Sequence, residues 1–326
     1  MSGGTEIKSF SAQVKRIFQV HELVGPLVAL IALFIASSAL SPYFLTAQNQ
    51  VVLLLMYVPL AVLALGEALI ILMGSIDLSP GSVMGLVTIS TAYLIVYMNV
   101  PLNYAILLGL AIGTLCGFIN GVLVTKAKLP SFVVTLSMLL AGRGIIFILT
   151  GGYSITGGEL PRLGVLVKPV YSLPLLTWIF VAIIPLYYVL LRRTTIGLYI
   201  YGIGGNEEAI RVSGVNADLI KIVAFSIAGF LYAVSGIFVL GQLQSAYAYI
   251  GQGYELNAIA SCVLGGISLA GGAGSPFSPL IGAYILTLIQ NILVLLGVNP
   301  YYHWVITAVV LVAAGAALTR GIKFAK

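Results

Sequence analysis

Long apolar runs separated by short polar stretches make up most of the chain. Each run is about 20 residues long, the length that an α-helix needs to cross the hydrocarbon core of a bilayer, and about ten such runs are present. Backbone in lipid must form its hydrogen bonds within the chain, so the runs are predicted to be helices. The fold class is therefore an all-α, polytopic transmembrane helical bundle, with residues 1–326 as a single domain. The expected spans are 24–40, 51–73, 80–98, 104–124, 131–150, 174–191, 219–241, 254–270, 277–297 and 302–319.

Composition agrees with this interpretation and excludes several classes of function. Hydrophobic residues make up 60% of the 326 positions and charged residues only 7%, against about 25% charged in soluble domains. Membrane lipid is therefore an expected partner. The chain holds no Gly-x-x-x-x-Gly-Lys-Ser/Thr loop, no Gly-x-Ser-x-Gly elbow and no histidine or cysteine spacing that suits a metal. We expect a protein that is not an enzyme, has no nucleotide-binding site of its own and needs no cofactor.

The distribution of the positive charge predicts the topology. The net charge is +6, from 15 lysines and arginines against nine acids. If the N-terminus is cytoplasmic, Arg162 and Lys168 lie outside and Arg143 lies within a span. Such a bias follows the positive-inside rule, so a multi-pass protein with both termini in the cytoplasm is expected and a nucleic-acid partner is not. The other twelve fall at the inner face: Lys8, Lys15, Arg16, Lys126, Lys128, Arg192, Arg193, Arg211, Lys221, Arg320, Lys323 and Lys326.

Residues 1–22 form a leader before the first span. Phe10, Val14, Ile17 and Phe18 recur there at helical spacing among lysines and arginine. This pattern is typical of an amphipathic helix that lies on the cytoplasmic membrane surface. A disordered leader is the alternative.

The longest polar interruption, 192–218, contains a candidate short helix. Asn206 can cap its N-terminus, Glu207 and Glu208 stand in the positive first turn, and Gly214 offers a left-handed stop. A rod of roughly 10 Å is too short to cross a membrane. It suits a knob that presses into a groove of another protein, although a loop with an incidental helical turn is equally compatible with the spacing.

Two acids and one cation are expected at membrane depth. A carboxylate there costs about 2.5 to 3.5 kcal/mol on insertion scales, so Glu67 and Asp77 must face protein or a water-filled cavity. Glycines and a proline around Asp77 predict a broken or re-entrant backbone, although Asp77 and Ser79 could simply cap the helix that begins at Pro80. Arg143 is expected to pair with Glu67 or another intramembrane acid, either as a structural tie or as a pathway group.

Glycine patterns predict close packing and an internal repeat. Four glycines at four-residue spacing, 109–121, predict a ridge that lets helices approach closely, and Asn120 is embedded in that face. The segment 265–269, which contains Ser268, echoes the segment 74–78 with a shift of 191 positions (265 minus 74). Two glycine-broken segments at corresponding positions of two halves indicate a transport site.

Three stretches together resemble the membrane permease subunits of bacterial ATP-binding-cassette importers for ribose, xylose, arabinose and galactose. The first is Gly-Ser-Ile-Asp-Leu-Ser at 74–79, and the second is Gly-Gly-Asn-Glu-Glu-Ala at 204–209, continued by Ser-Gly-Val at 213–215. The third is Gly-Tyr-Glu-Leu at 253–256, continued by Leu-Gly-Gly at 264–266 and Ser-Leu-Ala-Gly-Gly at 268–272. The similarity covers nearly the whole chain. Pro80, Asn257 and the pair Ser278–Pro279 depart from the family's usual residues, which leaves the transported sugar open.

The resemblance implies specific partners and site residues. It implies a bacterial inner-membrane location, a second permease copy or paralogue, a periplasmic sugar-binding protein, and a cytoplasmic ATPase subunit that docks on a coupling helix. Carried onto this chain, the coupling residues are Gly205, Asn206, Glu207, Glu208, Ala209, Arg211, Ser213 and Gly214. The pathway or core polar residues are expected to be Glu67, Asp77, Ser79, Asn120, Arg143, Glu255, Asn257 and Ser268.

These features predict ATP-driven alternating access for a monosaccharide, with affinity residing in the binding protein. The competing hypothesis is a secondary transporter that couples to H⁺ or Na⁺ through Glu67 or Asp77. A structural scaffold without transport is a third class.

Overall fold

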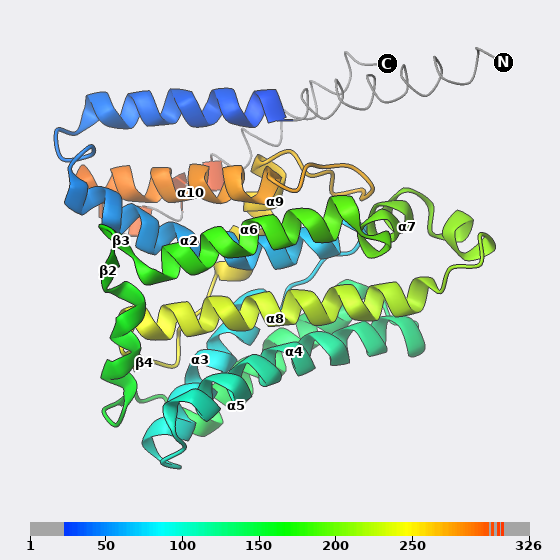
Figure 1. Cartoon of the computed structure of the whole chain (residues 1–326), viewed down its shortest axis with the longest axis horizontal. Coiled ribbons are helices and arrows are strands. Elements are labelled where there is room, and N and C mark those ends of the chain that lie inside the picture. Colours follow the sequence, from blue (N-terminus) through cyan, green and yellow to red (C-terminus); the bar gives the residue numbers. More distant parts are fainter. Residues whose placement is uncertain (1–22, 300, 303–304, 307, 310–326) are drawn as a thin grey trace.

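A computed structural model describes residues 23–299, 301–302, 305–306 and 308–309 as a bundle of long helices whose axes follow the long axis of the molecule (Figure 1). The first helix is Leu23–Leu40. It is followed by α2 (Ala47–Leu72), α3 (Pro80–Val96), α4 (Leu102–Lys126), α5 (Ser131–Thr150), α6 (Leu175–Arg193), α7 (Thr195–Val212), α8 (Ala217–Leu243), α9 (Tyr254–Leu264) and α10 (Ser278–Leu295). The all-α polytopic fold class is confirmed.

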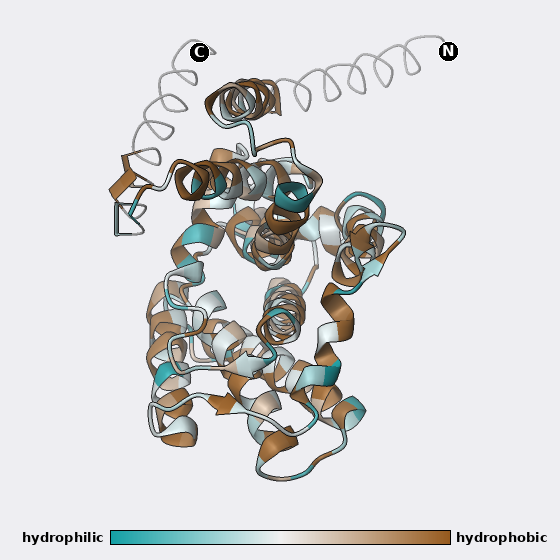
Figure 2. Cartoon of the chain, turned by 90° about the vertical axis from the view of Figure 1, so that its left-hand side faces the viewer, coloured by the Kyte–Doolittle hydropathy of each residue, from teal (hydrophilic) through white to brown (hydrophobic). Residues whose placement is uncertain are grey.

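The two ends of the bundle differ in character. At one end, here called the η1 end, lie the 3₁₀ helix η1 (Leu160–Val167) and four two-residue strands, β1 (Ile155–Thr156), β2 (Pro169–Val170), β3 (Leu173–Pro174) and β4 (Ser245–Ala246). The strands pair antiparallel as β1 with β4 and β2 with β3. Figure 2 looks onto this end and shows mainly apolar helices behind the polar loops. The other end, called the α7 end, carries α7 and the α4–α5 turn (Figure 1).

The centre of the bundle is formed by α2, α3 and α8, whose apolar side chains are largely buried. The glycine ridge of α4 lies on α8, as the spacing predicts. A Cβ atom on Gly113 would stand 2.8 Å from the Gly229 carbonyl oxygen, and one on Gly117 would stand 2.1 Å from the Phe225 carbonyl oxygen. These distances leave no room for a side chain, so the glycines allow the two helices to touch through their backbones.

Seven of the described helices are long and apolar enough to cross a membrane. Two further apolar helices are shorter, because α3 has 17 residues and α9 has 11. The predicted span 254–270 is therefore wrong in length, since its helix ends at Leu264 and a turn follows. The leader 1–22 and most of the span 302–319 lie outside the described residues, so the count of ten stays a prediction.

The chain breaks between α2 and α3 and folds back into the bundle. After Leu72 it turns at Gly74, and by Asp77 its backbone N–H lies 3.4 Å from Oε1 of Glu67, inside α2. The helix α3 therefore begins at the depth of Glu67 and not at the end of the bundle. The re-entrant backbone predicted around Asp77 is confirmed.

A second break, between α8 and α9, enters from the η1 end. The Ile250 carbonyl oxygen accepts a hydrogen bond from Arg143 at 2.6 Å. A Cβ atom on Gly81 would stand 2.3 Å from the Gly251 carbonyl oxygen. The segment 247–253 thus meets the first turn of α3 inside the bundle.

The two glycine segments predicted to correspond share the same kind of helix end, in a register one residue different from the prediction. Gly74 and Gly266 both have left-handed backbones, with φ of 73° and 94°. Each N–H bonds to the carbonyl three residues back, and the next N–H bonds five residues back, from Ser75 to Ile70 and from Ile267 to Cys262. Both helices α2 and α9 therefore end in the same Schellman turn, and the shift is 192 positions (266 minus 74). Sequence letters alone had aligned Gly74 with Gly265. Gly214 and Gly297 end their helices in the same way, so the internal repeat stays a prediction.

Candidate functional site

The 206–214 helix exists, and both of its ends form as the sequence predicts. Asn206 leaves helical geometry (φ −163°, ψ 98°), and its side chain accepts a hydrogen bond from the Ala209 N–H at 3.0 Å. At the other end Gly214 has φ of 86°, and the Val215 N–H bonds back to the Ile210 carbonyl. The predicted cap and stop are confirmed.

A helical stretch precedes this short helix and was not predicted. It runs from Thr195 to the break at Asn206, with Thr194 as its N-cap, whose hydroxyl accepts from the Gly197 N–H at 3.2 Å. Only Asn206 separates it from the 206–214 helix. The polar stretch is therefore almost wholly helical, bent once.

The bend places the 206–214 helix beside the α2–α3 break and the 265–277 segment between α9 and α10, through a contact of four glycines that we call the glycine junction: Gly74, Gly204, Gly271 and Gly272. A Cβ atom on Gly204 would stand 2.0 Å from the Leu72 carbonyl oxygen and 2.4 Å from the Gly272 nitrogen. One on Gly271 would stand 2.6 Å from the Gly74 nitrogen. The Gly272 N–H also donates to the Leu72 carbonyl at 2.9 Å. Backbone thus touches backbone where the 206–214 helix leaves the bundle.

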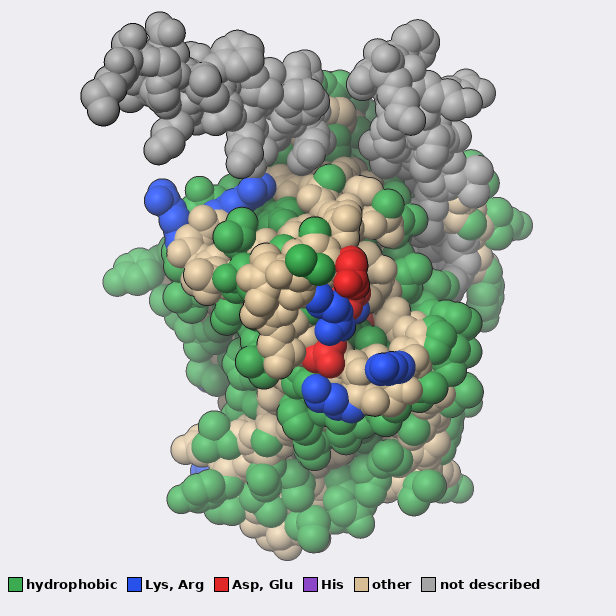
Figure 3. Space-filling view, turned by 90° about the vertical axis from the view of Figure 1, so that its right-hand side faces the viewer, with side chains coloured by type: hydrophobic (Ala, Val, Ile, Leu, Met, Phe, Trp, Pro, Cys, Tyr) green, Lys and Arg blue, Asp and Glu red, His purple; other side chains and the backbone are tan. Residues whose placement is uncertain are grey.

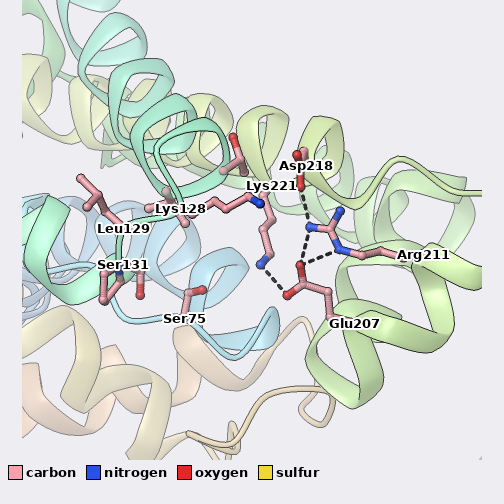
Figure 4. A pocket seen from close by; sticks show the side chains of 11 residues that line it. Ser75, Lys128, Leu129, Ser131, Glu207, Arg211, Asp218 and Lys221 are labelled. Atoms are coloured by element: carbon pink, nitrogen blue, oxygen red, sulfur yellow. Dashed lines mark hydrogen bonds and ion pairs between the residues drawn. The ribbon is translucent and has the colours of Figure 1, made fainter.

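Five charged side chains, here called the ion-pair network, tie the same helix to α4 and α8. Figure 4 labels Glu207, Arg211, Asp218 and Lys221, and Lys126 on α4 completes the network. Glu207 accepts from Lys221 Nζ at 2.6 Å and from Arg211 Nη2 at 2.7 Å. Arg211 also reaches Asp218 at 2.5 Å, and Lys126 lies 3.4 Å from the other oxygen of Asp218. Figure 3 shows acidic and basic side chains gathered near the middle of the α7 end, with further Lys and Arg side chains at its edge.

The ion pairs favour the ionised form of Glu207. Partial burial raises its pKa, but hydrogen bonds from Lys221 and Arg211 outweigh burial and hold the pKa below its ordinary value. Lys221 is the most buried member of the network, with a side chain 14% exposed. The Glu207–Lys221 pair is therefore its least solvent-screened contact.

Other predicted coupling residues face outward. Gly205, Glu208, Ala209, Ser213 and Gly214 are exposed. Within the described residues the Glu208 side chain forms no hydrogen bond or ion pair, in contrast to Glu207. The two adjacent acids thus have different surroundings, although the sequence gives them equal weight.

A second group of polar residues, here called the buried polar cluster, lies inside the bundle: Glu67, Asp77, Ser79, Asn120 and Tyr232. Glu67 and Asp77 are 0% and 1% exposed. The Tyr232 hydroxyl lies 3.3 Å from an oxygen of each. Because a hydroxyl carries one proton, both contacts are satisfied only when one carboxyl group is protonated.

The cluster joins four helices. Asp77 accepts from the Ser79 N–H at 2.7 Å and from its hydroxyl at 2.6 Å, and Asn120 donates to that hydroxyl at 3.1 Å. Asp77 therefore holds the turn before α3 and also contacts α8 through Tyr232. Among the residues that the structure describes, no side chain caps the first turn of α3, so the capping alternative is not borne out.

Of the two kinds of partner expected for Arg143, Glu67 is wrong, and the alternative of another acid fits better. Its Nη1 donates to the Ile250 carbonyl, and the acid that acts on it is Glu255 on the second break. Arg143 Nη2 and Glu255 Oε2 are both buried without a hydrogen-bond partner among the described residues. Asn257 and Ser268 are half-buried elsewhere on the second broken unit.

Sequence reasoning missed Tyr232, Lys221 and Asp218 as site residues. Tyr232 is a lone hydroxyl within an apolar span, and the signal that could have found it is the need of two buried acids for a donor. Lys221 and Asp218 follow the 206–214 helix directly and supply the opposite charges that its acids and arginine require.

Comparison with known proteins identifies the family. A family described as the permease component of branched-chain amino acid transport systems matches residues 49–315. The chain is 39% identical over 293 residues to the ribose import permease protein RbsC of Escherichia coli strain K12, covering 88% of this chain and 91% of the relative. It is 37% identical over 305 residues to RbsC of Bacillus subtilis strain 168, covering 90% and 92%.

A relative named for a different substrate is the autoinducer 2 import system permease protein LsrC of Escherichia coli O9:H4 strain HS. It is 34% identical over 300 residues, covering 91% of this chain and 87% of the relative. No solved structure was found to match. The chain therefore belongs to the permease family of ATP-binding-cassette importers that includes the ribose and autoinducer 2 permeases, and it is a multi-pass transporter subunit of the inner membrane.

Proposed function

We propose that this chain forms the translocation pathway for a monosaccharide and that a cytoplasmic ATPase subunit drives it by docking on the 206–214 helix. The α7 end then faces the cytoplasm, with both termini on that side. The η1 end faces a periplasmic sugar-binding protein, and a second permease copy or paralogue completes the pathway. The permease relatives, two of which import ribose and one autoinducer 2, support a small hydroxylated substrate.

The observation that carries the proposal is the contact at the glycine junction, where Gly204, just before the 206–214 helix, meets the α2–α3 break and the 265–277 segment. A capped helix transmits displacement without bending, and the junction has no side chains to absorb that displacement. Its motion therefore shifts the 74–79 segment and the 265–277 segment together. These segments precede α3 and α10, so the displacement reaches helices inside the bundle.

The ion-pair network gives the helix a second attachment. Lys221 and Asp218 belong to the first turns of α8, and α8 carries Tyr232 of the buried polar cluster. A movement of the 206–214 helix thus acts on α8 as well as on the two segments that meet at the glycine junction. Alternating access follows if α8, α3 and α10 move together, with the 74–79 and 265–277 segments, against the remaining helices.

Charge reversal at the exposed acid tests the proposal. With its importer's ATPase subunit and binding protein co-expressed, Glu208→Lys should greatly lower ATPase co-purification and substrate uptake, while the size-exclusion profile of the permease stays unchanged. Glu159→Lys, at the η1 end, is the matched control and should leave ATPase co-purification intact. Unchanged co-purification and uptake with Glu208→Lys would count against the proposal.

A further inference from the structure

A pocket of about 520 Å³ lies between the 206–214 helix, the α4–α5 turn and the first turns of α8 (Figure 4). Its polar lining includes Lys128, Arg211, Lys221 and the hydroxyl-bearing residues Ser75 and Ser131. Its apolar walls are Val124, Leu129 and Pro130. Docking of an ATPase on the outer face of the 206–214 helix gives this pocket no role, and the buried polar cluster lies elsewhere in the bundle.

The charge of the lining is positive after its carboxylates are counted. Lys128, Arg211 and Lys221 contribute +3 and Glu207 and Asp218 contribute −2, which leaves +1. Lys126, which is paired to Asp218 just outside the lining, adds one further positive charge. All four carboxylate oxygens of Glu207 and Asp218 already pair with cations. This pairing offsets the negative charge of both acids and so weakens their repulsion of an incoming anion.

The pocket lining has more N–H donors than it has acceptors to receive them. Lys221 has three N–H groups and one acceptor among the described residues. The Lys128 side chain has no hydrogen bond or ion pair there, and Figure 4 shows it extending toward Lys221 and the Glu207–Arg211 pair. An anion with several acceptor oxygens would satisfy these donors together.

Exposed apolar side chains lead from the pocket along the first turn of α5. Leu129, Phe132 and Val133 are 42%, 53% and 39% exposed. The pocket therefore sits where a lipid headgroup would lie, with a neighbouring surface that acyl chains can cover. Basic pockets between transmembrane helices on the cytoplasmic side bind anionic headgroups.

We propose that this pocket binds a phosphate-bearing anion, supplied by an anionic phospholipid headgroup of the cytoplasmic leaflet or by free phosphate, with Lys128 and Lys221 as its main cationic contacts. The bound phosphate would touch the bundle through both lysines and the 206–214 helix through Arg211. It would therefore add a third attachment between that helix and the bundle.

The test measures binding of a fluorescent phosphatidylglycerol to the purified full chain in micelles, with phosphatidylcholine as the neutral probe. Wild type should bind phosphatidylglycerol in preference, and Lys128→Asn should weaken that binding about tenfold. Asn suits this position because Lys128 has a left-handed backbone, with φ of 55°. Lys168→Asn makes the same charge change at the η1 end and should bind as wild type does.

Inorganic phosphate distinguishes the two sources. If phosphate displaces the lipid, the pocket accepts the free anion; if only lipid competes, the headgroup with its chains is the ligand, and either result supports the site. Lys128→Arg should restore binding and shows that the Asn variant acts through charge and not through folding. Equal binding of the two lipids by wild type, or unaltered binding by Lys128→Asn, would overturn the proposal.

This assay uses neither ATPase nor sugar. A negative result leaves the proposed transport function standing, and a failure of ATPase docking leaves the anion site standing.

Discussion

The buried polar cluster and the ion-pair network both hold charged groups, but in opposite surroundings. Glu67 and Asp77 are closed off from solvent, whereas Glu207 and Arg211 have side chains 34% and 41% exposed. A buried polar group costs free energy unless every partner is present, whereas an exposed pair costs little to break. The comparison teaches that the cluster fixes the positions of α2, α3, α4 and α8, while the network forms a contact that can open and close.

The largest effect is expected from removing a carboxylate of the buried polar cluster. Asp77→Ala leaves the Ser79 N–H and hydroxyl without their acceptor, and we expect a loss of about 3 kcal/mol in the free energy of unfolding. Asp77→Asn keeps an acceptor oxygen and should lose less. Denaturant titration in micelles measures both, and equal losses would show that the hydrogen bonds are not what the carboxylate supplies.

The glycine junction connects the two regions, and adjacent glycines offer a matched test. Gly204→Ala forces a methyl group against the Leu72 carbonyl, with an expected loss of about 1 to 3 kcal/mol in the free energy of unfolding and a larger loss of uptake. A Cβ atom on Gly205 meets nothing within 4 Å in the chain itself, so Gly205→Ala should keep the stability of the wild type. Uptake that is equal in the two variants would remove the junction from the coupling route.

The ion-pair network should contribute less to stability than to coupling. Lys221→Glu places like charges together and should lower uptake per ATP hydrolysed, with a stability change of about 1 kcal/mol or less. Adding Glu207→Lys restores opposite charges and should recover part of the coupling. A double variant no better than the single one would separate the pair from force transmission.

The smallest effect is the response of this network to pH. The folded pKa of Glu207 lies below its unfolded value, so its contribution is complete above the unfolded value and is lost as pH falls through the folded one. Hydrogen exchange of the 206–214 backbone should therefore speed up only in acid, below about pH 4.3. Glu207→Gln should remove most of that pH dependence.

Local chemistry made much of this structure predictable. The Asn206 cap and the Gly214 stop depend on neighbouring residues, and the Gly109–Gly121 ridge depends on one helical period, so all three formed as expected. The re-entrant turn at Asp77 also followed from glycines and a proline close in sequence. The roles of these residues in transport stay predictions.

Contacts between distant segments were not predictable in the same way. Tyr232 meets Asp77 across 155 positions, and Arg143 meets Ile250 across 107. The shortness of α9 follows from its Schellman turn at Gly266, which the hydropathy of 254–270 hides. Arg143 was expected to pair with Glu67 because both lie at membrane depth. The sequence does not show that the 247–253 segment enters the bundle beside Arg143 and takes its hydrogen bond.

The most direct test of the account is a photo-activated cross-linker at position 208 in the assembled importer, compared with one at position 153 at the η1 end. Tyr153 is 81% exposed and serves as an accessible control. We predict that position 208 cross-links to the ATPase subunit and that position 153 does not. Cross-linking of the ATPase from 153, or its absence at 208 in an importer that hydrolyses ATP, would contradict the central claim that force enters through the 206–214 helix.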